Sequence, residues 1–203
     1  MDRQVLFPHT ASRRLVFRPA STGHHSDLLR TMLRTGIESV SPSARGGERD
    51  LSRCDAAFLV TSRSSGDVLG FSTLHGLDAA GHVKSGVYLD PLRARLGVGS
   101  EAIYLTINYA FAMFDVAKVV AQTTEATFGS VGLTTDGSEA TAVLRDHLYF
   151  RGRHWDLHTF ELGRDEWERH VDGELGGVLG PGLSWRRAPG PLGPAPSRPR
   201  PAA

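Results

Sequence analysis

The sequence predicts a single domain of the mixed α/β (α+β) class, in which a largely antiparallel sheet is flanked by helices. The length of 203 residues suits one ordinary domain. Short apolar runs typical of strands alternate with segments of helical periodicity along most of the chain. Short turns rich in glycine, serine and aspartate separate several strand segments, as they do in antiparallel sheets.

The first half of the chain is expected to contribute three strands and one helix. Residues 15–18 (LVFR) predict the first strand. A cap at Ser26-Asp27 begins a helix through LLRTMLR, and Gly36 ends it. Residues 56–61 and 68–74 predict two strands, joined by SRSSGD in a connection typical of a hairpin.

The second half continues the alternation of strands and helices. Residues 83–89 predict a strand, and residues 99–114 predict a long helix with one apolar face. Residues 118–124 (KVVAQTT) predict another strand. Residues 143–150 and 155–162 predict two final strands on either side of a glycine turn.

Three regions are expected along the chain. Residues 1–13 form an N-terminal extension, residues 14–170 form the domain, and residues 171–203 form a Gly/Pro-rich tail. From Pro181 onward, Pro, Gly, Ala and Arg dominate the composition. Such a segment cannot build a hydrophobic core, so we expect it to be disordered.

Composition excludes several classes of protein. The net charge of +1 argues against bulk electrostatic binding of nucleic acid or acidic membranes. The single cysteine, Cys54, excludes a disulfide framework and a cysteine-based zinc site. No apolar run approaches the ~18 residues of a membrane span, and the first residues lack the core of a secretory signal. We therefore expect a soluble cytoplasmic protein. We also expect no metal site, because His24-His25 and the pair His154 and His158 lack carboxylate or cysteine partners.

The most informative motif is a glycine-containing turn between a predicted strand and a predicted helix. It comprises Gly97, Val98, Gly99 and Ser100. A helix N-terminus has unpaired N–H groups and a positive dipole, so it attracts phosphate, and glycines allow a close approach. A turn without any ligand is the other interpretation. The turn is neither a P-loop, since no Lys-Ser/Thr follows, nor a complete dinucleotide fingerprint.

The order of motifs resembles that of the GCN5-related N-acetyltransferases (GNAT). Within this family it is most similar to the ribosomal-protein-alanine acetyltransferase-like group. The resemblance covers residues 15–168. The matching segments are LVFRPAS, GDVLGFSTLHGLD, VKSGVYLDPLRARLGVGSEAIYLTINYAF, VAKVVAQTTEA and LRDHLYFRGRHWDLHTFELGRDEW. The last of these contains Gly152 and Asp156, which match a Gly-x-x-x-Asp turn of the family, and the pair Glu166-Trp167.

The resemblance implies a donor, a reaction and a set of binding residues. The donor would be acetyl-CoA. A primary amine of a small metabolite, an antibiotic or a protein N-terminus would attack its thioester directly. The implied donor-binding residues lie on the strand, at the turn and in the next helix: Val87, Tyr88, Leu89, Arg95, Leu96, Gly97, Val98, Gly99, Ser100, Thr127 and Ser130.

The chain departs from the family in the residues just before the glycine-containing turn. Ala94 and Leu96 stand where the family often has polar or basic residues, and Arg93 or Arg95 is expected to compensate. The family's Asn-x-x-Ser becomes Thr127-x-x-Ser, and no tyrosine stands in that helix. Two alternatives therefore stay open: a donor that is an aminoacyl-tRNA or an acyl carrier protein in natural-product biosynthesis, and a non-catalytic acyl-CoA-binding module.

Two residues are candidates for moving the proton of the amine. His75 follows a predicted strand and Glu125 ends another, so both could face the site. An imidazole accepts a proton at neutral pH, and a carboxylate could act through water. The alternatives are a surface loop position for His75 and a helix-capping role for Glu125.

Overall fold

A seven-stranded sheet forms the centre of the part of the chain that the computed structural model describes. The described residues are 6–24, 26–28, 30–31, 51–90, 92–94, 97–123, 140–150 and 152–179. The strands are β1 (Leu15–Pro19), β2 (Cys54–Ser62), β3 (Val68–His75), β4 (His82–Leu89), β5 (Lys118–Thr123), β6 (Ala142–Phe150) and β7 (Arg153–Gly163). Among the described residues, two helices have both ends defined, α2 (Val98–Met113) and α4 (Arg164–Leu179), and 3-10 turns lie at Thr22–His24 and Leu51–Arg53.

The strands follow one another across the sheet in the order β1-β2-β3-β4-β5-β7-β6. All neighbours are antiparallel except β4 and β5, which run parallel. Every predicted strand, and the helix predicted at residues 99–114, is present with its ends within two residues of the prediction. The predicted fold class is therefore confirmed. Of the helix predicted after Ser26, residues 26–28 and 30–31 are described and are helical, whereas Gly36 lies outside the described residues.

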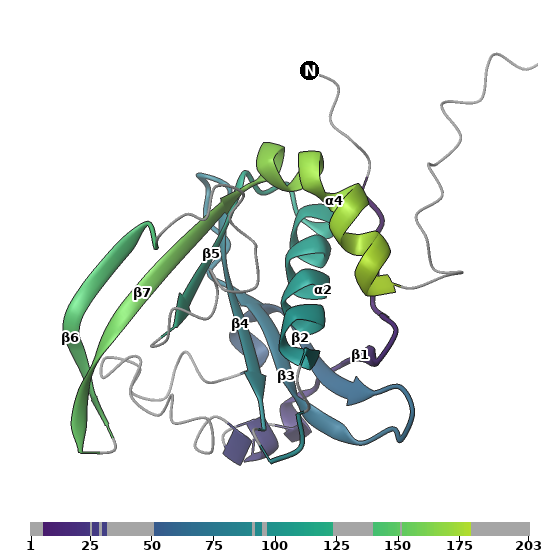
Figure 1. Ribbon diagram of the computed structural model, residues 1–203, viewed down its shortest axis with the longest axis horizontal. Coiled ribbons are helices and arrows are strands. Elements are labelled where there is room, and N and C mark those ends of the chain that lie inside the picture. Colours follow the sequence, from purple (N-terminus) through teal and green to yellow (C-terminus); the bar gives the residue numbers. More distant parts are fainter. Residues whose placement is uncertain are drawn as a thin grey trace, which may run out of the picture.

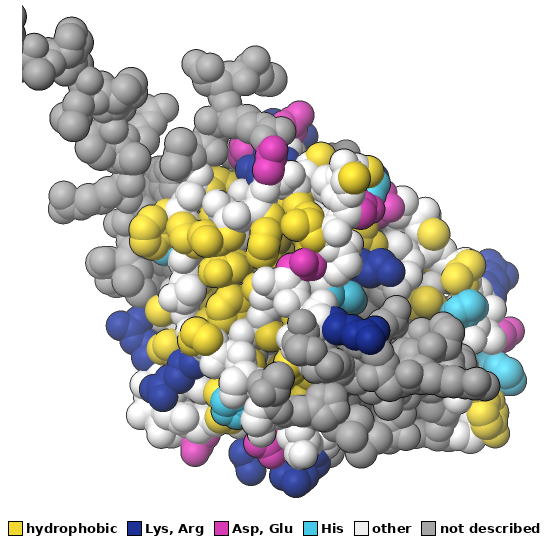
Figure 2. All heavy atoms as spheres, turned by 180° about the vertical axis from the view of Figure 1, so that it is seen from behind, with side chains coloured by type: hydrophobic (Ala, Val, Ile, Leu, Met, Phe, Trp, Pro, Cys, Tyr) yellow, Lys and Arg dark blue, Asp and Glu magenta, His cyan; other side chains and the backbone are white. Residues whose placement is uncertain are grey.

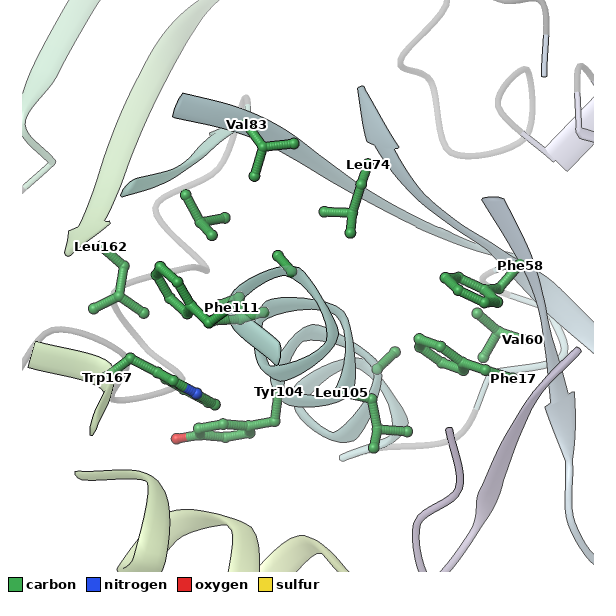
Figure 3. Close-up of a cluster of buried hydrophobic side chains, with 14 of the residues drawn as sticks. Phe17, Phe58, Val60, Leu74, Val83, Tyr104, Leu105, Phe111, Leu162 and Trp167 are labelled. Atoms are coloured by element: carbon green, nitrogen blue, oxygen red, sulfur yellow. The ribbon is translucent and has the colours of Figure 1, made fainter. Parts of the chain in front are cut away.

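Helix α2 packs against one face of the sheet and is the centre of the main hydrophobic core. Figure 3 shows Leu74 and Val83 of the sheet on one side of α2, and Trp167 of α4 beside Tyr104 on the other. The ring centroids of Tyr104 and Trp167 are 5.8 Å apart. Burying a side chain of this size stabilises the fold by about 1.5–3 kcal/mol, so these contacts fix α2 against the sheet.

Both predicted domain boundaries fall inside packed structure. Helix α4 continues to Leu179, and Val171 is 2% exposed in the main core, so residues 171–179 are helical. Trp167, Val171 and Val178 share one helical face, and this apolar spacing outweighs the local glycine content. At the other end, Leu6 is 6% exposed in the same core. Arg13 N–H donates to the carbonyl of Val178 at 3.1 Å, which ties the two ends of the domain together.

The hairpin of β6 and β7 contains an irregular pairing that explains one sequence motif. The pairing shifts between Leu144 and Leu148, where Asp146 has a positive φ of 50°. The carboxylate of Asp156 accepts a hydrogen bond from the N–H of Asp146 at 2.9 Å. Gly152 adopts φ 74° in the turn that joins the strands. The Gly-x-x-x-Asp motif therefore shapes this hairpin.

The surface of the described residues is mixed in character. Figure 2 shows a band of hydrophobic side chains across one face, with lysine and arginine side chains on either side of it. Phe7 and Leu92 are among the exposed large hydrophobic residues. Among the described residues, no helix has the length and apolar character that crossing a membrane requires.

Candidate functional site

The two parallel strands in the middle of the sheet stop pairing before either of them ends. Their last paired residues are Ser85 and Ala121, although β4 continues to Leu89 and β5 to Thr123. Figure 1 shows the two arrows diverging toward their C-terminal ends. Strand β4 remains paired with β3 as far as Leu89. The end of β4 therefore follows β3 and leaves β5, and we call this place the split.

Backbone N–H groups of β4 are directed into the split. Asp90 N–H donates to the carbonyl of Leu69 at 2.8 Å, so it points toward β3. Successive N–H groups of a strand alternate in direction. Those of Val87 and Leu89 therefore point away from β3, to the side that β5 has left.

The glycine turn (residues 97–100) forms the N-terminus of α2 next to the end of β4. Gly97 is the N-cap residue, with φ 81° and no side-chain capping bond. The N–H groups of the first helical turn have no acceptor within the helix, and they carry the positive end of its dipole. The Cδ1 atom of Leu89 lies 3.9 Å from the position that a Cβ on Gly99 would occupy. The end of β4 and the glycine turn are thus in contact.

The comparisons with known proteins concern this fold. No protein-family model and no curated protein sequence matches the chain significantly. Solved structures do match, each with a probability of 1.00. A probable GNAT acetyltransferase of Chromobacterium violaceum has a TM-score of 0.55 at 19% identity, over 82% of this chain and 92% of that one. A mutant spermidine/spermine N-acetyltransferase of Vibrio cholerae has a TM-score of 0.58 at 12% identity, over 77% and 98%. A putative phosphinothricin N-acetyltransferase has a TM-score of 0.58 at 16% identity, over 73% and 98%.

The chain has the GNAT fold. The matches cover nearly the whole of the neighbours' chains, so the correspondence extends over the complete domain. Because identity is below 20%, the likeness shows the fold alone, and the predicted ribosomal-protein-alanine acetyltransferase-like group remains a prediction.

A partly buried ion pair joins the N-terminal segment to the first turn of α2 in this GNAT fold. Glu101 is 6% exposed, and its carboxylate accepts hydrogen bonds from the Ser12 hydroxyl at 2.5 Å and from Nε of Arg14 at 2.7 Å. The Arg14 guanidinium also lies against the glycine turn, because a Cβ on Gly97 would be 2.7 Å from Nη2. A cation is therefore held at the N-terminus of α2.

Sequence reasoning did not identify Arg14 and Glu101, although a signal was present. Glu101 occupies the same helical face as Val98, Ala102 and Leu105, which are all buried. An acidic residue in an apolar stripe implies a polar partner that the fold must supply. That partner is Arg14, 87 residues earlier in the chain, and no local sequence pattern indicates that the two residues meet.

Arg93, one of the two arginines expected at the phosphate turn, points elsewhere. Its Nη1 donates to the carbonyl of Val68 at 3.3 Å, and its Nε lies 3.8 Å from the carboxylate of Asp90. Both partners are close to the start of β3 and the end of β4. Asp90 is 4% exposed and also accepts the N–H of Leu92 at 3.0 Å, so it shapes the turn that follows β4.

The face of the sheet opposite α2 carries Tyr88 and His75. The Tyr88 ring folds back over Gly86, where a Cβ would lie 2.6 Å from the phenolic oxygen. His75 is half-buried and pairs with Lys84. It is a diagonal neighbour of Gly86 on the same face, which corresponds to a backbone separation of about 7–8 Å. His75 therefore lies on this face one strand away from the split, opposite the last part of β4 that pairs with β5.

The remaining predicted site residues have no described position. They lie outside the described residues and are Arg95, Leu96, Glu125, Thr127 and Ser130. The residues that the structure does bring together at the split and the glycine turn are Val87, Tyr88, Leu89, Gly97, Val98, Gly99 and Ser100.

Proposed function

We propose that the protein is an acyltransferase that moves an acetyl group from acetyl-CoA to a primary amine. The observation that carries this proposal is the split between β4 and β5 next to the glycine turn, within a GNAT fold. The solved neighbours that are named as N-acetyltransferases support the general reaction.

The residues at the turn fit the phosphates of coenzyme A. Gly97 has the positive φ that glycine tolerates. Among the described residues outside the helix's own backbone, the atom nearest to an added Cβ on Gly99 is Cδ1 of Leu89, at 3.9 Å. The free space at Gly99 and the N–H groups of the first turn suit an anion. We assign the Arg14 guanidinium as the cation of this site, in place of the side chains absent at Ala94 and Leu96.

The chemistry needs few groups from the protein. Attack by the amine forms a C–N bond at the thioester carbon and breaks the C–S bond; the nitrogen loses a proton and the sulfur gains one. Negative charge develops on the carbonyl oxygen, which the N–H groups of Val87 and Leu89 are suited to stabilise. We assign the removal of the amine proton to His75, directly or through water. Tyr88 lines the side from which the amine enters.

The acceptor in this proposal is a small amine. The neighbours include proteins named for spermidine, spermine and phosphinothricin. A protein N-terminus or an antibiotic remains within the same chemistry. Membership of the ribosomal-protein-alanine acetyltransferase-like group is part of the proposal and rests on the motifs of the sequence.

Thiol release from acetyl-CoA, measured with a panel of amines that includes spermidine, tests the function. We expect thiol release that depends on the amine. We also expect a large loss of acetyl-CoA affinity in Gly99→Val, because the valine side chain would occupy the space proposed for the phosphates at the glycine turn. Gly177→Val in α4, where no described residue lies within 4 Å of an added Cβ, is the matched control. Unchanged affinity in a folded Gly99→Val protein would exclude this donor site. Binding of acetyl-CoA without thiol release with any amine would instead support a non-catalytic acyl-CoA-binding module.

A further inference from the structure

Gly70 in β3 lies directly against the backbone of β4. It pairs with Leu89, the last residue of β4. A Cβ on Gly70 would collide with the carbonyl oxygen of Tyr88 and would lie 2.8 Å from the Cα of Leu89. These are backbone atoms, so no side-chain rotation can relieve the collision. Only glycine allows this approach.

The approach occurs on the face of the sheet that carries α2. Ser72, two residues from Gly70 along β3, exchanges a hydrogen bond with Thr106 of α2, so the side chains at positions 70 and 72 share this face. Tyr88 and Leu89 therefore pass over Gly70 on the α2 side. In this way β4 bends out of the line of the sheet, toward α2, just after its pairing with β5 has ended.

The bend also sets the distance between the two halves of the donor site. One half comprises the N–H groups of Val87 and Leu89, and the other is the glycine turn. The Leu89 side chain connects them, because its Cδ1 lies 3.9 Å from the Cβ position of Gly99. A side chain at position 70 would push Leu89 away from β3 and would change the spacing between the halves.

We infer that Gly70 is a positioning residue for acyl transfer, which holds the thioester-binding end of β4 at the correct spacing from the phosphate-binding turn. The inference rests on the proposed function. It concerns ligands that span both halves, such as acetyl-CoA. The affinity of a ligand that occupies only the phosphate half does not depend on this spacing.

Calorimetry with two ligands on the full chain tests this inference. The probes are acetyl-CoA and adenosine 3′,5′-diphosphate, which carries the phosphate end without pantetheine. We expect Gly70→Ala to weaken acetyl-CoA binding by about tenfold or more, because small misplacements at a reacting site have large effects. The affinity for adenosine 3′,5′-diphosphate should stay within about twofold. Gly163→Ala in β7, where an added Cβ would have no neighbour within 4 Å in the described part of the chain, should leave both affinities unchanged.

The possible outcomes separate the two proposals. If the unmodified protein does not bind acetyl-CoA, the proposed function fails and this inference fails with it. If it binds, but folded Gly70→Ala has a lower melting temperature and an unchanged acetyl-CoA affinity, Gly70 is merely structural and only the inference fails. Equal losses for both ligands also overturn it. Should Gly70→Ala not fold, Leu89→Ala is compared in the same way; equal acetyl-CoA affinity in that variant overturns the inference.

Discussion

At the scale of single residues, Arg14 connects the stability of the domain to the proposed donor site. Its Nε is bound to the buried carboxylate of Glu101, and the rest of its guanidinium lies beside Gly97. The side chain is 48% exposed, so one side of it faces solvent while the other is anchored. The anchor reduces the conformational freedom that an arginine would lose on binding an anion.

Replacing Arg14 should weaken the donor at its phosphate end. A charge-assisted hydrogen bond contributes roughly 1.5–3 kcal/mol, so we expect Arg14→Gln to lower the affinity for acetyl-CoA about tenfold or more. The affinity for acetyl-pantetheine, which lacks the phosphates, should be unaffected. Calorimetry with both compounds measures this, with Arg18→Gln on the exposed side of β1 as the control. Equal losses for the two compounds would show that Arg14 does not act on the phosphates.

A second residue-scale prediction concerns acid stability. Burial lowers the pKa of His9 from its ordinary value of 6.5, and its buried Nε2 has no hydrogen-bond partner among the described residues. The unfolded chain therefore takes up this proton at a higher pH than the folded protein does. The contribution of neutral His9 to the free energy of unfolding is fully present above pH 6.5 and decreases as the pH falls below it.

Urea unfolding at about pH 7.5 and about pH 5.5 measures this contribution. The free energy of unfolding should decrease between the two values, and His9→Phe should show a smaller decrease. An equal decrease in the variant would mean that other groups cause the acid sensitivity.

At the scale of elements, strands and helices were predictable where the apolar pattern is local. The strands at residues 56–61 and 68–74 and the helix at residues 99–114 were confirmed because each has its own periodicity and its own turn residues. Helix α4 was not predicted. Gly173, Gly176 and Gly177 disfavour a helix locally, and tertiary packing, such as the contact of Trp167 with Tyr104 of α2, compensates for them.

Arg164, the first residue of α4, holds this helix to the C-terminal end of α2. It is 8% exposed, and its guanidinium donates to the carbonyls of Val116 at 2.8 Å, Phe111 at 2.8 Å and Phe114 at 2.9 Å. These acceptors belong to the last turn of α2 and the residues that follow. The guanidinium thus satisfies carbonyls that a helix end leaves without partners.

We expect Arg164→Ala to reduce the free energy of unfolding by about 3 kcal/mol, because buried acceptors and the paired Glu168 lose a charged partner. Arg164→Lys should recover little, since an ammonium cannot reach three carbonyls in the same geometry. Urea titration measures both variants. Acetyl-CoA affinity should stay unchanged, because the glycine turn is at the other end of a helix about 24 Å long. Full stability in Arg164→Ala would contradict this role.

At the scale of the whole molecule, the segments at the two ends of the domain belong to its packed structure. Residues 6–13 and 171–179 pack together, although the sequence suggested that each lies outside the domain. The partners of Leu6, Val171 and Val178 are distant in the sequence, so a local reading could not find them. The same limit applies to the site: the glycine turn was visible in the sequence, whereas Arg14 and Gly70 gain their roles only through the fold.

Two truncations test this boundary. Ending the chain after Gly180 should leave the melting temperature nearly unchanged, because the composition beyond that point cannot form a core. Ending it after His170 removes the buried Val171, which is 2% exposed. That should cost about 1.5–3 kcal/mol or more and lower the melting temperature clearly. Equal melting temperatures for the two truncated proteins would contradict the packing of α4.

Calorimetric titration of the full chain with acetyl-CoA at low and at high salt tests the central claim most directly. The account predicts saturable binding of one acetyl-CoA per chain, largely retained at high salt, because the donor is held by directed hydrogen bonds as well as by charge. Absence of binding at both salt concentrations would contradict the claim that the split and the glycine turn form an acetyl-CoA site. In that case an aminoacyl-tRNA or carrier-protein donor would have to be tested in its place.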